Sequence, residues 1–175
     1  MKTRGDYMGI TRIKDIMKRD GEEYYKNICK EKMIYKILND YEIRRYKPRG
    51  KNACLIRVLE PEYKKYGIPY NVNHLAEFHS VMELYFHDIR ECLPSQERFI
   101  LFNKDLAISV IDLINQNQFD EIIVHCNAGQ SRSVGIMIGI SMLLNDSRLR
   151  ESIELDKFYM PNPIVVDVFK QVLNH

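Results

Sequence analysis

The sequence lacks the features that mark several specialised classes of protein. It has no repeat at a fixed period and no low-complexity stretch, which argues against a repeat architecture. Its aliphatic runs are far shorter than the roughly 18 residues of a membrane span, and its first residues lack the apolar centre of a signal peptide. We therefore expect a cytoplasmic protein without a membrane span.

Cysteine is scarce and widely spaced. The chain has four cysteines, none in a Cys-x-x-Cys pair, at positions Cys29, Cys54, Cys92 and Cys126. This spacing suggests neither a zinc site nor a secreted disulfide scaffold. We expect reduced thiols, no metal and no other cofactor.

Charge is unevenly distributed along a chain of 175 residues, the length of one ordinary domain. Residues 1–50 carry 14 Lys or Arg against 8 Asp or Glu, a net charge of +6, whereas residues 51–175 carry 12 against 16, a net charge of −4. Such a basic arm is compatible with nucleic acid, an anionic membrane or an acidic partner. Because its basic residues are mixed with acids, a solvated extension is the favoured interpretation.

The division between this arm and the rest is expected near residue 50. The stretch "EEYYKNICKEKMIYKILNDY" (22–41) spaces its apolar residues like an amphipathic helix. "RRYKPRGKN" (44–52) then combines charges with Pro48 and Gly50, as a boundary does. We predict a helical extension over residues 1–50 and a second domain over residues 51–175.

The second domain has the pattern of an α/β fold. Strands are predicted at 53–60, at 81–89 and at 121–125. Pro61, Gly67, Pro69 and Asn71 mark an irregular connection after the first strand. Helices are predicted to begin at Asn103, a suitable N-cap, and to cover 133–144, 148–159 and 163–174. Because a helix separates two buried strands, we predict a largely parallel central sheet flanked by helices.

The junction between the strand 121–125 and the next helix has the composition of an anion site. Loop amides and first-turn amides point the same way there, and the helix dipole adds positive potential. Gly129 allows a tight loop, and Arg132 offers a planar fork for two oxygens of a phosphate. The same field favours the thiolate form of Cys126. The Cys126 loop, residues 126–132, thus combines a nucleophile with an anion receptor.

The stretch "HCNAGQSRS" (125–133) resembles the signature of the cysteine-based protein phosphatases, which is His-Cys, five residues, Arg, then Ser or Thr. Cys126 and Arg132 match the invariant pair of that signature. The Ala-Gly before Ser-Arg-Ser is most similar to the dual-specificity branch. The resemblance covers residues 53–174 in layout and implies the α/β fold of that family, but it does not cover the basic arm.

By this resemblance, Cys126 attacks the phosphorus of a phosphomonoester and forms a cysteinyl-phosphate intermediate without a metal. The residues expected to bind the phosphate are Asn127, Ala128, Gly129, Gln130, Ser131 and Arg132. Ser133 is expected to hydrogen-bond the sulfur and help it leave, and His125 to support the loop from below.

The general acid of the family is an Asp on a loop after an upstream strand. Asp88 fits that position, and Asp105 and Asp112 are rivals that fall within the predicted helix before the Cys126 strand. Asn162, in a Pro-Asn segment like that of dual-specificity domains, is expected to brace a loop.

The resemblance implies a phosphoprotein substrate carrying phosphotyrosine and also phosphoserine or phosphothreonine. Neutral Asn127 and Gln130 argue against a phosphoinositide, since lipid phosphatases of the superfamily tend to place Lys in this loop. RNA 5'-phosphates stay an alternative because of the basic arm. A sulfurtransferase of the rhodanese type and a phosphate-binding module without catalytic activity are the other classes left open.

Overall fold

The structure is a computed structural model that describes residues 33–91 and 98–174. Contacts group Ile34–His175 into one compact unit, to which the following description is confined. Residues 1–32 lie outside the described residues. They include most of the predicted extension 1–50 and the first part of the helix predicted over residues 22–41. For that part of the chain, the division into an extension and a second domain stays a prediction.

The centre of the unit is a four-stranded sheet in the order β1-β4-β2-β3. The strands are β1 (Ile34–Leu38), β2 (Ala53–Leu59), β3 (Ser80–Tyr85) and β4 (Glu121–His125), and every neighbouring pair is parallel. All residues of β2 and β4 are buried, because both faces of these inner strands are covered. The predicted α/β fold with a parallel sheet is therefore confirmed.

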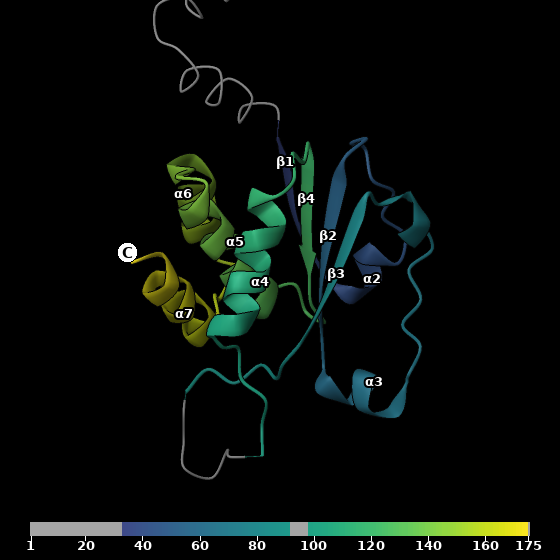
Figure 1. Cartoon of the computed structure of the whole chain (residues 1–175), viewed down its shortest axis with the longest axis horizontal. Coiled ribbons are helices and arrows are strands. Elements are labelled where there is room, and N and C mark those ends of the chain that lie inside the picture. Colours follow the sequence, from purple (N-terminus) through teal and green to yellow (C-terminus); the bar gives the residue numbers. More distant parts are fainter. Residues whose placement is uncertain (1–32, 92–97, 175) are drawn as a thin grey trace, which may run out of the picture. The chain divides into compact units, whose positions relative to one another are not determined.

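Helices cover both faces of the sheet. Figure 1 shows α4 (Lys104–Asn115), α5 (Arg132–Leu143), α6 (Ser147–Leu155) and α7 (Pro163–Leu173) on one side. The shorter helices α2 (Asp40–Ile43) and α3 (Pro61–Tyr66) lie on the other side. In the part of the chain just described, no helix has both the length and the apolar character needed to cross a membrane.

Local signals explain where the larger helices begin. The Asn103 side chain accepts a hydrogen bond from the backbone N–H of Leu106 and caps α4, as predicted. Asn162 caps α7 in the same way through Val165, and Pro163 occupies the first helical position. The predicted helices after Asn103, at 133–144 and at 163–174 are thus confirmed to within a residue or two.

The helix predicted over residues 22–41 is wrong at its C-terminal end, where residues 34–38 form β1. This strand pairs with β4 from Ile34, opposite Glu121, to Leu38, opposite His125. Its β-branched and aromatic residues suit a strand, and their apolar spacing fits both periods over so short a run. Pairing with β4 therefore decides the conformation.

Two boundaries around β2 and β3 also differ from the prediction. The strand predicted over residues 81–89 ends at Tyr85, so Asp88 lies in the loop beyond it. The connection after β2, predicted to be irregular, contains α3, which has Pro61 at its first position and Gly67 in the left-handed conformation at its end. Its six residues are too few to show a helical apolar period.

The predicted boundary segment is attached to the sheet. The buried carboxylate of Glu121 accepts hydrogen bonds from the backbone N–H groups of Arg49, at 2.7 Å, and Gly50, at 2.8 Å. Asp120 binds the next two amides along the chain. The turn before β2 is therefore held at the start of β4, and the two strands that flank it belong to one sheet.

Candidate active site

The Cys126 loop connects the end of β4 to the first residue of α5 and is held from outside by the end of β1. Gly129 has a φ of 67°, and a Cβ on it would lie 3.0 Å from the backbone nitrogen of Asn39. The backbone N–H of Asp40 donates to the carbonyl of Asn127 at 3.0 Å. The loop thus needs a glycine because of a strand that the sequence did not predict.

Cys126 lies at the base of the loop, between the last residue of β4 and the N-terminus of α5. Its side chain is buried, with 2% of the residue exposed. The Sγ atom lies 3.1 Å from the Oγ atom of Ser133, in the first turn of α5. The thiol therefore has a hydroxyl partner and the positive end of a helix dipole beside it.

Arg132 closes the other end of the loop, and its guanidinium is held by two further segments. One terminal nitrogen donates to the carbonyl of Phe86 at 2.9 Å, and the other forms an ion pair with Glu60 at 2.6 Å. The Nε–H group is buried and has no partner among the described residues. The fork is thus fixed in place by the contacts of its two terminal nitrogens.

Glu60 is the residue of this site that the sequence did not reveal. It directly precedes Pro61 and begins α3, and that local pattern indicates only a helix start. Its partner Arg132 is far away in the sequence, so no spacing rule links the two.

Asp88 is brought to the Cys126 loop by two side chains. Its Oδ1 atom accepts hydrogen bonds from the Oγ of Ser131 at 2.7 Å and from the Nδ2 of Asn162 at 2.8 Å. Asn162 also binds the carbonyl of Ile89, and its own N–H donates to the carbonyl of Ser131. Asn162 thus braces two loops at once.

The rival carboxylates lie elsewhere. Asp105 and Asp112 are exposed on α4. Neither takes part in the hydrogen bonds that the described part of the chain makes with the Cys126 loop. Of these three carboxylates, Asp88 is therefore the one that is hydrogen-bonded to the Cys126 loop.

His125 lies beneath the loop and is almost completely buried. Its ring stacks on Tyr70 with centroids 5.6 Å apart, and neither ring nitrogen has a hydrogen-bond partner among the described residues. Burial, and then the positive charges of Arg57, Arg132 and Arg44, lower its pKa to about 3. The ring is therefore neutral at physiological pH, as a packing support for the loop requires.

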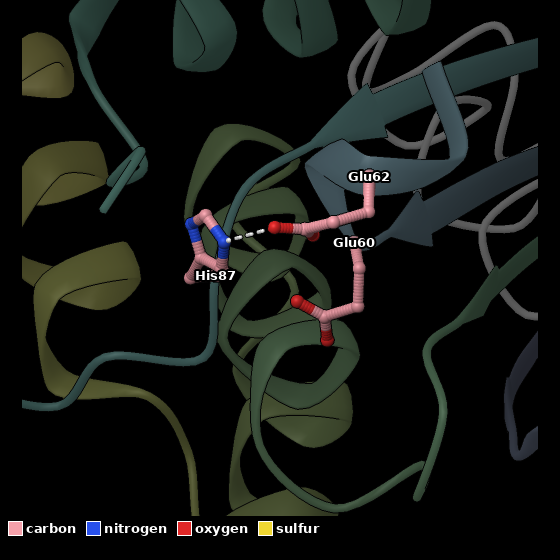
Figure 2. Close-up of side chains that lie close together, drawn as sticks. All are labelled: Glu60, Glu62 and His87. Atoms are coloured by element: carbon pink, nitrogen blue, oxygen red, sulfur yellow. Dashed lines mark hydrogen bonds and ion pairs between the residues drawn. The ribbon is translucent and has the colours of Figure 1, made fainter. Parts of the chain in front are cut away.

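Glu60, Glu62 and His87 bring their ligand atoms within 4.8 Å of one another, as a metal site requires (Figure 2). However, the Nδ1 atom of His87 accepts a hydrogen bond from the backbone N–H of Ile100 at 2.9 Å. The Nε2 atom then carries the proton, which it donates to Glu62 at 3.3 Å. The Glu60 carboxylate is already in an ion pair with Arg132. These three side chains are therefore better explained as hydrogen-bonded and ion-paired groups than as metal ligands.

Comparisons with known proteins leave the chemistry of this site open. No family model matches the chain, and no curated protein matches it. A solved structure described as the crystal structure of PTPMT1 overlaps with 81% of this chain and 90% of its own, at 14% identity and a TM-score of 0.48. A likeness at this level says nothing about the chemistry of the Cys126 loop.

The buried His125 makes stability depend on pH in a defined window. Its pKa in the folded state, about 3, lies below the ordinary value of 6.5, so the unfolded chain binds the proton first. The free energy of unfolding should therefore fall as the pH drops below about 6.5, by about 2 kcal/mol between pH 7 and pH 5 from this residue alone.

Urea unfolding of the native protein and of His125→Asn at both pH values measures this effect. The variant should be less sensitive to pH by that amount, whatever its stability at pH 7. His79→Asn, at an exposed position, controls for the loss of one imidazole. An equal pH dependence in the native protein and in His125→Asn would contradict the assignment.

Proposed function

We propose that this chain is a cysteine-dependent phosphomonoester hydrolase of the dual-specificity type, acting on phosphoproteins. One observation carries the proposal. Cys126 and Arg132 lie at the two ends of a single loop, and Asp88 is hydrogen-bonded to that loop through Ser131 and Asn162. A nucleophile, an anion receptor and a carboxyl group in one place are the parts that phosphoryl transfer through cysteine needs.

In the first step, the Cys126 thiolate attacks phosphorus, and the bond from phosphorus to the ester oxygen breaks. The leaving oxygen takes a proton from the carboxyl group of Asp88. The two donors to Asp88 both bind Oδ1, which leaves Oδ2 to carry that proton. The product of this step is a cysteinyl phosphate and a free hydroxyl group on the substrate.

In the second step, the Asp88 carboxylate removes a proton from a water molecule that attacks the cysteinyl phosphate. The sulfur leaves as a thiolate, which the hydroxyl of Ser133 at 3.1 Å stabilises by donating a hydrogen bond. The products are inorganic phosphate and free Cys126.

Throughout both steps, the loop amides and Arg132 hold the oxygens of the phosphoryl group. Glu60 acts as a positioning residue, because its ion pair fixes the guanidinium at the end of the Cys126 loop. The loop amides and Arg132 are thereby already positioned to stabilise the charge that develops on the phosphoryl oxygens.

The substrate class rests on the composition of the loop. Asn127 and Gln130 add no charge to the cradle, which favours a singly phosphorylated side chain over a highly charged inositol headgroup. We propose phosphotyrosine as one substrate, with phosphoserine and phosphothreonine as the others. A reducing, intracellular location belongs to the same proposal, since the nucleophile must stay a thiol.

Hydrolysis of para-nitrophenyl phosphate in the presence of EDTA tests the activity. The native protein should turn over this substrate without added metal. Cys126→Ser should abolish turnover while still binding a phosphotyrosine peptide, because the substitution removes the nucleophile and keeps the cradle. If the native protein is folded but does not turn over the substrate, the proposed activity is wrong and the chain is a phosphate-binding module without catalytic activity.

The role of Asp88 is tested by its isosteric amide. Asp88→Asn should lower kcat on an alkyl phosphate ester by about 10²- to 10⁴-fold, since the leaving oxygen loses its proton donor. The pH profile of kcat should lose the limb that reports this acid. Asp105→Asn is the matched control on α4, and the same loss of kcat in that variant but not in Asp88→Asn would overturn the assignment.

A further inference from the structure

A basic groove lies beside the candidate active site. Its volume is about 460 Å³, and it runs between α3 and the segment that follows β3. Three cations line it, Lys64 and Lys65 from α3 and Arg98 from the far wall. Tyr85 and the half-exposed Ile100 give it an apolar surface as well.

Two of the groove's residues connect it to the site. Glu62 lies two residues after Glu60, the partner of Arg132, and His87 directly precedes Asp88. His87 and Glu62 are hydrogen-bonded to each other, and Figure 2 shows them beside Glu60. The groove is therefore lined in part by residues that lie within two positions of Asp88, the proposed acid, and of Glu60, the partner of Arg132.

The charge of the groove is locally positive in a part of the chain that is net negative. Residues 51–175 carry 12 basic against 16 acidic residues. Among the described residues that line the groove, Glu62 is the only carboxylate, and it is bound to His87 and attracted by Lys65. Among the described residues, Lys64 contacts the ring of Tyr85 and Arg98 that of Phe99, rather than carboxylates. Lys64 and Arg98 are thus available to an acidic ligand.

We propose that the basic groove binds an acidic side chain of the phosphoprotein substrate, a carboxylate or a second phosphate close in sequence to the residue whose phosphate enters the Cys126 loop. This inference rests on the proposed function and names the substrate class more closely. An extended peptide advances about 3.3–3.6 Å per residue, so a neighbouring side chain reaches a surface that begins at the rim of the site. The apolar wall of Tyr85 and Ile100 suits the remainder of a polypeptide.

The test compares phosphotyrosine peptides that differ in one position, glutamate or glutamine, scanned through the residues on both sides of the phosphotyrosine. For the native protein, kcat/KM should be roughly three- to tenfold higher with glutamate at the favoured position. This ratio should decline at high salt, because the ion pairs are exposed. An equal kcat/KM for both peptides at every position would overturn the proposal.

Charge reversal assigns the preference to the groove. Lys64→Glu/Lys65→Glu should bring the glutamate-to-glutamine ratio to one or below. Lys104→Glu/Lys157→Glu makes the same change in net charge at exposed positions outside the groove and should keep the native ratio. An equal ratio of kcat/KM for the glutamate and glutamine peptides in the two double variants would show that the groove does not bind the acidic side chain.

Binding measurements keep the inference separate from the proposed activity. Fluorescence anisotropy with labelled peptides and Cys126→Ser should show the same preference for glutamate, even if the native protein proves to lack turnover. A lack of preference in this assay would overturn the inference by itself. A further arm uses phosphatidylcholine vesicles containing phosphatidylinositol bisphosphate. If turnover of that lipid, and not of the peptides, depends on Lys64 and Lys65, the groove serves a lipid headgroup and the inference is wrong.

Discussion

The site depends on the position of one guanidinium group. Arg132 begins α5, and its two terminal nitrogens are held by the carbonyl of Phe86 after β3 and by Glu60 before α3. Three segments that are distant in sequence meet at this side chain, at the carboxyl ends of parallel strands where α/β folds place their ligands. Because the Arg132 side chain is buried and held at both terminal nitrogens, the fork is fixed before a ligand arrives, which is the preorganisation that charge stabilisation requires.

Electrostatics in the layer below the loop follows from the same arrangement. Arg57 and His125 are partners in the register of β2 and β4, and both are buried. Burial, and then the positive charge of the arginines, lower the pKa of His125 and keep its imidazole neutral, so the support beneath Cys126 adds no charge that changes near neutral pH. The fixed charges around His125 are therefore arginines with carboxylate partners, Arg57 with Glu83 and Arg132 with Glu60.

The sequence predicted the parts of the site that are local and missed those that depend on pairing. The strand, loop and helix around Cys126 follow from a continuous apolar run, a tight glycine loop and a second apolar run. Asn103 was predicted as a cap because a cap acts within four residues. Asn162 was expected only to brace a loop, and the structure shows that it also caps α7. By contrast, β1 has an apolar spacing that also fits a helix, and only its pairing with β4 decides between them. Glu60 gave no signal because its partner is far along the chain.

A covalent intermediate is the most direct measurement of the proposed chemistry. Asp88→Asn is mixed with a phosphotyrosine peptide, quenched in acid within the first turnover, digested and analysed by mass spectrometry. Slow breakdown of the intermediate in this variant should leave a phosphoryl group on the peptide that contains Cys126, and Cys126→Ser should show none. Two results would contradict the assignment of Cys126 as the nucleophile, provided that the native protein turns over the peptide. One is a phosphoryl group on another residue, and the other is the lack of a phosphorylated residue in both variants.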